Sequence, residues 1–183
     1  MQVRKRVIAI SGMPGAGKGI AADAAKQLGL EVLVLGDVIR EETQRRGLDP
    51  TPQNMGEVML KVRSEEGPAA VAKRLLPKVE ERKPKVVIVE GVRGPEELAE
   101  LKSKFEVVTI VIHASPRTRF QRLLSRSRSD DPKTWETFHE RDERELKVGL
   151  GHVIALADTV VVNEGTIAEL QSSLIGILAK LKA

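Results

Sequence analysis

The chain has no cysteine and no tyrosine, and its aromatic residues are one tryptophan and three phenylalanines. Without cysteine it can form neither a disulfide framework nor a thiolate metal site. Its three histidines are scattered along the chain, which argues against a histidine-built metal site. No apolar run approaches the roughly 20 residues that a membrane-spanning helix needs, so we expect no membrane partner.

Apolar residues make up 41% of the 183-residue chain and charged residues 31%, which is typical of a folded globular protein. The basic and then apolar start, MQVRKRVIAI, is too short in its apolar part for a signal peptide, and a glycine-rich stretch follows it. We therefore expect one domain over residues 1–183, in the cytoplasm. The net charge of +4 suits anionic ligands but is small for a dedicated nucleic-acid-binding protein, so RNA is a less favoured partner than a small anion.

Short runs rich in valine and isoleucine alternate with helical patterns along the chain. These runs are almost continuously apolar, which is typical of strands buried on both faces of a parallel sheet. The alternation predicts an α/β fold of three layers, with a five-stranded parallel sheet and helices on both faces. The predicted strands are Val7–Ile10, Val32–Leu35, Val86–Val89, Val107–Ile112 and Thr159–Val162.

Several helix starts carry their own signals. Ser115-Pro116 and Asp131-Pro132 each place a capping side chain before a proline at the first helical position. Thr166 and Glu169 form a capping-box pattern that opens the last helix. Pro77 falls inside a helical pattern, which we expect it to kink or divide. No strand pattern interrupts residues 41–85, which we interpret as a helical insertion between the second and third strands.

The sequence GMPGAGKG connects the first predicted strand to an alanine-rich helix. Its glycines allow backbone N–H groups to approach phosphate oxygens, and the start of the helix carries partial positive charge. Lys18 adds a charge for the β- and γ-phosphates. The usual next residue is Ser or Thr, which holds Mg²⁺, whereas Gly19 and Ile20 have no hydroxyl. The predicted ATP-binding residues here are Gly12, Met13, Pro14, Gly15, Ala16, Gly17, Lys18 and Gly19.

The third predicted strand ends in a carboxylate, Glu90, which is typical of a site for Mg²⁺ or its waters in phosphoryl transfer. The alternative is a solvated acid at a strand end. Farther along, arginines gather between Arg117 and Arg144, and Arg119, Arg122 and Arg126 have the spacing of one helix face. The alternative for this run is a solvated basic face.

The phosphate loop resembles that of adenylate kinase and other nucleoside monophosphate kinases, in which Gly and then Thr follow the lysine. Gly19 fits that pattern and Ile20 departs from it. Glu90-Gly-Val-Arg93 is similar to the Asp-Gly-x-Pro-Arg turn of these kinases, and Gly36 to Arg40 resembles their GDxxR segment. The resemblance implies that Arg40 and Arg93 bind an acceptor phosphate.

Asp37 lies in the same GDxxR segment and also resembles the proposed base of dephospho-CoA kinase. The resemblance implies that Asp37 lies close to the phosphates and the metal. Asp37 and Glu90 are therefore our candidates for holding Mg²⁺ through water. Asp37 could instead, or in addition, cap the helix that carries Arg40.

The run from Arg126 to Asp131, followed by Arg141, is similar to the lid of short-lid nucleoside monophosphate kinases. In them, lid arginines neutralise the transferred phosphoryl group. We therefore expect a short, arginine-rich lid within residues 115–147, with Arg122 as an ATP ligand. Arg141 lies about half a turn farther along than expected, which leaves Arg144 as a substitute. The candidate catalytic residues are Lys18, Asp37, Arg126, Arg128 and Arg141.

The stretch Ala157–Gly165 is similar to the end of dephospho-CoA kinase, where the last loop passes near the adenine. This implies base contacts from the backbone of Asn163 to Gly165, although an ordinary strand-to-helix loop would give the same pattern. The whole chain resembles an archaeal family of adenylate-kinase-related P-loop proteins. That resemblance implies ATP binding and supplies no substrate.

The leading hypothesis is an ATP- and Mg²⁺-dependent phosphotransferase acting on a phosphate-bearing, nucleotide-like small molecule, with residues 41–85 on the acceptor side. The first alternative is an ATP-binding switch or slow ATPase that acts on RNA or a protein partner. The second is a degenerate loop that binds nucleotide without turnover. The oligomeric state is left open.

Overall fold

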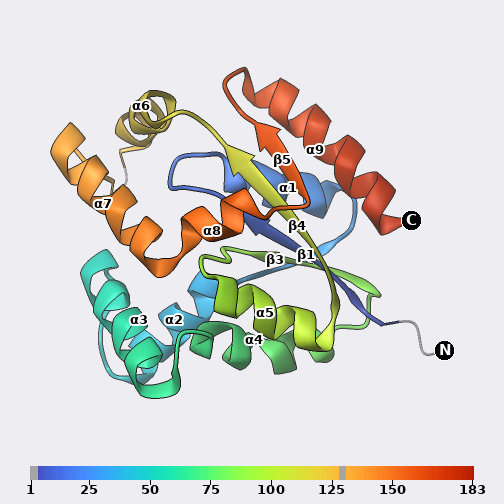
Figure 1. Cartoon of the computed structure of the whole chain (residues 1–183), viewed down its shortest axis with the longest axis horizontal. Helices are drawn as coiled ribbons and strands as arrows, with labels where there is room; N and C mark the ends of the chain where they lie inside the picture. Colours follow the sequence, from blue (N-terminus) through green and yellow to red (C-terminus); the bar gives the residue numbers. More distant parts are fainter. Residues whose placement is uncertain (1–3, 128–130) are drawn as a thin grey trace.

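The computed structural model describes residues 4–127 and 131–183, so Arg128 and Asp130 of the predicted lid lie outside the described residues. A parallel five-stranded sheet with the order β2-β3-β1-β4-β5 forms the centre of the molecule (Figure 1). This confirms the predicted sheet. Its strands are β1 (Arg6–Ser11), β2 (Glu31–Val34), β3 (Val86–Glu90), β4 (Glu106–His113) and β5 (Thr159–Val162).

Both faces of the sheet are covered, because successive residues of a strand point to opposite sides. Val7 and Ala9 of β1 belong to one buried cluster, and Ile8 and Ile10 belong to another. The first cluster is completed by α2 (Leu35–Arg45), α3 (Pro52–Glu66), α4 (Ala70–Glu80) and α5 (Pro95–Lys104). The second is completed by α1 (Lys18–Gln27) and α9 (Ile167–Lys182).

Three further helices follow β4: α6 (Pro116–Arg126), α7 (Trp135–Val148) and α8 (Leu150–Ala155). Three of the four aromatic side chains join α6 to α7, since the rings of Phe120, Trp135 and Phe138 lie 5.2–5.4 Å apart between centroids. Met13 of the phosphate loop packs with Leu150 and Val153 of α8. Three of the few aromatic residues therefore hold α6 and α7 together.

Two local predictions were wrong. Helix α7 begins at Trp135, with Thr134 as its N-cap, because Thr134 and Thr137 cap each other reciprocally. Asp131 instead receives two hydrogen bonds from Arg126. Helix α2 begins at Leu35, the residue at which the second strand was predicted to end.

Pro77 does not divide its helix, because α4 runs from Ala70 to Glu80 with Pro77 inside it. Buried residues on both sides of Pro77 keep the helix against the sheet. At the end of α4, the ammonium of Lys5 donates to the carbonyls of Val79, Glu80 and Arg82. These bonds satisfy terminal carbonyls that a helix leaves without partners.

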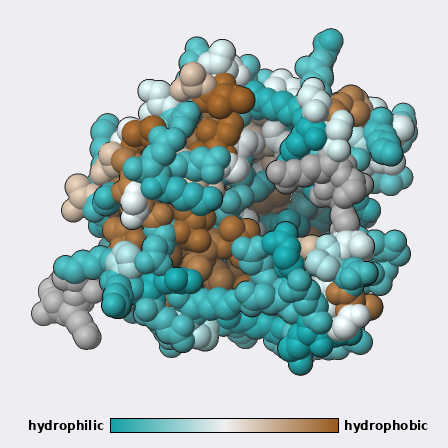
Figure 2. Space-filling view, turned by 180° about the vertical axis from the view of Figure 1, so that it is seen from behind, coloured by the Kyte–Doolittle hydropathy of each residue, from teal (hydrophilic) through white to brown (hydrophobic). Residues whose placement is uncertain are grey.

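No helix within the described ranges is long and apolar enough to cross a membrane. Seen from behind, one face of the molecule carries a band of hydrophobic residues with hydrophilic residues around it (Figure 2).

The chain from β2 to β3, all of which the structure describes, forms α2, α3 and α4 and contains no strand, as the sequence predicts for that segment.

Candidate functional site

The phosphate loop joins β1 to α1 at the carboxyl end of the sheet. Gly12 has φ +144° and Gly17 has φ +111°, conformations that favour glycine. A Cβ atom at Gly12 would overlap the carbonyl oxygen of Ile112 in β4, and one at Gly17 would lie 2.6 Å from Nδ2 of Asn163. The loop thus needs glycine both for its turns and for its close approach to its neighbours.

Lys18 opens α1 and its side chain turns back over the loop. Its Nζ donates to the carbonyls of Gly12 at 2.7 Å and Met13 at 3.2 Å. Burial, and then the positive charge of Arg93, lower the pKa of Lys18 from 10.5 to about 8. A buried ammonium of this kind favours an anionic ligand, since negative charge would restore its usual protonation.

Asn163 attaches the phosphate loop to the last loop of the chain. It is 4% exposed, and its Nδ2 donates to the carbonyl of Ala16 at 2.8 Å. Arg122 donates to the carbonyl of Asn163 at 3.0 Å and to that of Gly165 at 3.4 Å. In this structure both carbonyls and the guanidinium of Arg122 hold the loop in place, while their contacts to ATP remain predictions.

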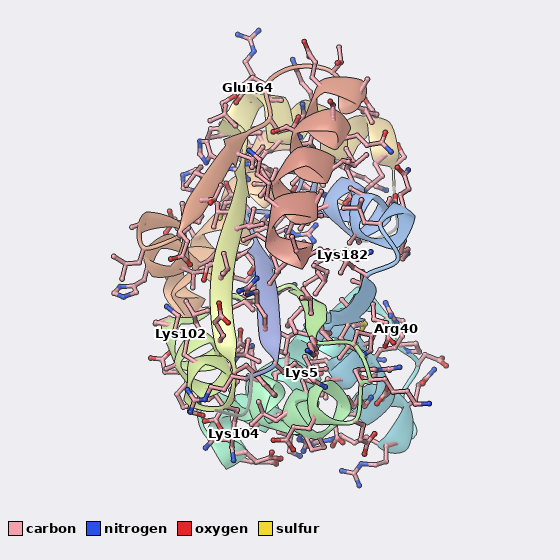
Figure 3. All side chains as sticks on the ribbon, turned by 90° about the vertical axis from the view of Figure 1, so that its right-hand side faces the viewer. Lys5, Arg40, Lys102, Lys104, Glu164 and Lys182 are labelled. Carbon is pink, nitrogen blue, oxygen red and sulfur yellow. The ribbon has the colours of Figure 1, made fainter. Side chains whose placement is uncertain are left out.

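Glu164 of the same loop accepts hydrogen bonds from Thr118 and from the backbone and side chain of Ser115. It therefore fixes the start of α6, where Ser115 is the N-cap as predicted. Figure 3 shows Glu164 at the top of the view and Arg40 lower down, at the right-hand edge. The loop between β5 and α9 and the start of α6 thus form one hydrogen-bonded unit.

Arg119 is buried, although its spacing in the sequence placed it on the same helix face as Arg122 and Arg126. The side chain is 4% exposed and binds Asp142 of α7 through two hydrogen bonds. It also donates to the carbonyls of Ala114 and Pro14, and its guanidinium lies 5.0 Å from the ring centroid of Phe138. Arg119 is therefore an internal link between the phosphate loop and the lid helices, and not part of a solvated face.

The two carboxylates predicted to hold Mg²⁺ lie at the ends of neighbouring elements. Glu90 ends β3, and its burial raises the pKa of its carboxyl above 4.5, with the charge of Lys18 acting in the opposite direction. Asp37 is in the first turn of α2 and pairs with Arg40. Since Val34 is the N-cap of α2, the alternative of Asp37 as the N-cap is wrong.

These carboxylates suit a hydrated Mg²⁺ better than an enclosed metal site. Within the described part of the chain, no three His, Asp or Glu side chains come together as metal ligands. Mg²⁺ commonly uses one or two carboxylates together with waters and phosphate oxygens. Glu90 and Asp37 can supply the carboxylates. The nearby hydroxyl of Ser11 is fully buried and donates to the carbonyl of Val92 at 2.5 Å. The side chain of Ile20 packs against the hydrophobic cluster formed with α1 and α9.

Arg93 lies at the centre of a series of charged contacts. Its Nη1 donates to Oε1 of Glu145 in α7 at 3.0 Å. Its backbone N–H donates to Glu97 of α5 at 2.8 Å, and the other oxygen of Glu97 accepts from Arg63 of α3 at 2.5 Å. The turn after β3 is thereby connected to both the insertion and the lid side of the molecule. Neither Glu97 nor Glu145 had a sequence signal that distinguished it from a surface acid.

The remaining predicted residues are dispersed. Arg40 is 52% exposed, and Figure 3 shows it at the outer edge of the molecule on the α2 side. Arg126 holds Asp131 through two hydrogen bonds, and Arg141 lies 3.7 Å from the same carboxylate. The structure thus places Glu90 and the turn that bears Arg93 beside the start of the phosphate loop. It also gathers Arg126 and Arg141 around Asp131.

Comparison with known sequences identifies the family. The profile of the family described as AAA domain matches residues 11–139. A UPF0200 protein of Pyrococcus abyssi is 46% identical over 180 residues, covering 96% of each chain. Another, from Pyrococcus furiosus, is 49% identical over 174 residues, covering 92% of this chain and 93% of the relative.

Comparison with solved structures supports the P-loop kinase fold. TT1252 from Thermus thermophilus superposes with a TM-score of 0.67 at 19% identity, over 97% of this chain and 98% of that one. Shikimate kinase from Acinetobacter baumannii gives 0.60 at 16% identity, over 99% and 96% of the two chains. A gluconokinase from Sinorhizobium meliloti gives 0.60 at 16% identity, over 99% and 95%. These likenesses show the fold, and together with the sequence matches they establish that the chain belongs to the archaeal UPF0200 family of P-loop proteins.

Proposed function

We propose that this protein is a phosphotransferase that binds ATP with Mg²⁺ and passes the γ-phosphoryl group to a phosphate-bearing, nucleotide-like small molecule. The observation that carries the proposal is that Glu90 and the turn bearing Arg93 lie beside the start of the phosphate loop, at the carboxyl end of a parallel sheet, since Glu90 pairs with Ile10 and the carbonyl of Val92 accepts from Ser11. Ligands of open parallel sheets bind at that edge. A P-loop lysine, a carboxylate and a second cation are the groups that phosphoryl transfer requires there.

The donor side of the site consists of the phosphate loop and its support. Loop N–H groups and Lys18 would hold the β- and γ-phosphates, and Glu90 with Asp37 would hold Mg²⁺ through water. When bound, Mg²⁺ would neutralise charge on the phosphate oxygens. Asn163 and Arg119 keep the loop in shape by binding the carbonyls of Ala16 and Pro14.

On the acceptor side, Arg93 would bind the acceptor phosphate, because a guanidinium matches phosphate geometry. Arg40 would join it from α2 after leaving its contact with Asp37. From the lid, Arg126, Arg128 and Arg141 would neutralise the phosphoryl group in transit. Positioning and electrostatics would supply most of the rate enhancement, since phosphoryl transfer needs little covalent chemistry from the protein.

An acceptor panel tests the proposal. The protein is incubated with ATP and Mg²⁺ and with nucleoside monophosphates, deoxynucleotides or dephospho-CoA, and ADP and phosphorylated products are measured. We expect one class to raise ADP release above the rate without acceptor, and Lys18→Ala to abolish the increase. ATP turnover that RNA or a protein partner stimulates, without a phosphorylated small product, would instead indicate the switch or slow ATPase. No increase with any acceptor would contradict the proposal.

A further inference from the structure

Glu145 is a buried carboxylate with one oxygen left over. The residue is 8% exposed, and its Oε1 accepts the hydrogen bond from Arg93. Its Oε2 is also buried and has no hydrogen-bond partner among residues 4–127 and 131–183. Buried polar atoms in native proteins are almost always paired, so an exception indicates a missing water, ion or ligand. A carboxylate oxygen can be satisfied only by a hydrogen-bond donor or a cation.

Glu145 is joined to the turn that follows β3, because it accepts the hydrogen bond from Arg93. This turn lies beside the start of the phosphate loop, since the hydroxyl of Ser11 donates to the carbonyl of Val92. The charge of Glu145 raises the pKa of Lys18, while that of Arg93 lowers it, so all three groups share one electrostatic environment. The end of α7 is fixed against the turn that follows β3, since a Cβ atom on Gly94 would lie 3.2 Å from the carbonyl oxygen of Val148. Packing thus holds the end of α7, which carries Glu145, against this turn.

The charge at this position distinguishes two kinds of accepting group. A phosphate as the reacting group would bring as much as two negative charges toward the carboxylate oxygen that has no partner. A hydroxyl would bring no charge, and it would supply the donor that Oε2 lacks. The unpaired oxygen therefore favours a hydroxyl next to the γ-phosphate.

A second buried atom supports a ligand beside the same turn. Nη1 of Arg63 has no hydrogen-bond partner within the described ranges, and the side chain is 13% exposed. Arg63 is connected to the backbone of Arg93 through Glu97. An acceptor that carries both an anionic group and a hydroxyl would satisfy an unpaired donor and an unpaired acceptor of the protein.

We infer that the acceptor reacts through a hydroxyl group, and that Glu145 binds this hydroxyl and takes its proton. The inference rests on the proposed phosphotransfer and specifies its acceptor chemistry. The hydroxyl oxygen forms a bond to the γ-phosphorus, and the bond from that phosphorus to the β–γ bridging oxygen breaks. ADP leaves with the electron pair, and the hydroxyl proton moves to Oε2 of Glu145. The products are a phosphate monoester and ADP.

The decisive variant is Glu145→Gln, which keeps the shape of the side chain and an oxygen for Arg93 but cannot take the proton. We expect it to lower kcat about 100-fold or more, the usual effect of losing a general base. The same loss should appear for slow ATP hydrolysis, in which water replaces the acceptor hydroxyl.

Two controls separate this role from a merely structural one. Glu143→Gln removes the same charge from an exposed position on the same helix, and it should leave the rate and KM unchanged. Glu145→Asp retains a carboxylate and should recover part of the activity. Thermal unfolding and the binding of a fluorescent ATP analogue show whether each variant is folded.

The nature of the product provides an independent test. Phosphorus NMR distinguishes a new monoester, which we expect, from a phosphoanhydride. A phosphoanhydride product, or a Glu145→Gln variant as active as the wild type, would overturn the hydroxyl inference and leave the phosphotransferase standing. If the wild type releases ADP neither with water nor with any acceptor, the proposed function fails and the inference fails with it.

Discussion

Arg119 of α6 and Asp142 of α7 form a buried ion pair with two parallel hydrogen bonds, of 2.8 and 2.6 Å. The side chains are 4% and 14% exposed. The same guanidinium reaches the carbonyl of Pro14 at 3.2 Å, so the pair connects the lid helices directly to the phosphate loop. The phosphate loop is therefore held in part by an ion pair between α6 and α7.

Breaking this pair should be costly. We expect Asp142→Leu to lower the free energy of unfolding by about 3–5 kcal/mol, because it leaves the charge of Arg119 buried without a partner. Denaturation in urea measures the change. The double variant Arg119→Met with Asp142→Leu should lose less than the sum of the two single variants. Additive effects would show that the two side chains do not depend on each other.

Two neighbouring glycines should respond oppositely to alanine. Gly17→Ala forces a side chain into a positive-φ conformation and against Asn163, so stability and ATP affinity should both fall. Gly19 lies in α1, and a Cβ atom there would meet open space within the described part of the chain. Gly19→Ala should therefore stabilise the protein by about 0.4–1 kcal/mol. Thermal unfolding and ATP titration of both variants check this, and a destabilised Gly19→Ala would contradict it.

ATP binding should depend on pH through Lys18. The pKa of this ammonium is lowered to about 8, so affinity should be nearly constant below pH 8 and decline above it as the charge is lost. Bound phosphates stabilise the charged form, so binding near pH 8 should take up protons. Calorimetry in two buffers of different ionisation enthalpy measures this uptake. Lys18→Arg stays charged over the whole range, and proton uptake that persists in it would exclude Lys18 as the source.

Glu90→Gln should make the folded protein more stable at neutral pH. Burial raises the pKa of Glu90 above 4.5, so the folded state binds more protons than the unfolded state between 4.5 and the raised value, and stability falls as pH rises through that window. At pH 7 the variant lacks this partly buried charge, so its Tm should be higher than that of the wild type. The gain should vanish below pH 4.5.

The same Glu90→Gln variant tests the metal site. If Glu90 holds Mg²⁺, the variant should lose most of the effect of Mg²⁺ on nucleotide binding and turnover. Titration of Mg²⁺ against a fixed ATP concentration measures this effect. A variant that responds to Mg²⁺ like the wild type would place the metal on other groups.

The sequence by itself determined the sheet and the phosphate loop. Runs such as Val107–Ile112 are apolar on both faces, which only a covered parallel sheet accommodates, and all five strands formed where these runs lie. Gly12, Gly17 and Lys18 lie within a few residues of one another, so their spacing alone identifies the phosphate loop. Signals of this kind can be recognised in a sequence because cause and consequence are adjacent in the chain.

Tertiary structure decided which charged residues meet. Asp131 and Thr134 both have side chains that can cap a helix. Asp131 accepts hydrogen bonds from Arg126 instead, and α7 starts at Trp135 with Thr134 as its N-cap. Arg93 meets Glu145, which lies 52 residues away, and Arg119 meets Asp142, which lies 23 residues away. The sequence holds 30 basic and 26 acidic residues, so charge alone allows very many pairs. Only the packing of α6 and α7 over the loop selects these, because a buried charge must find its partner within hydrogen-bond distance.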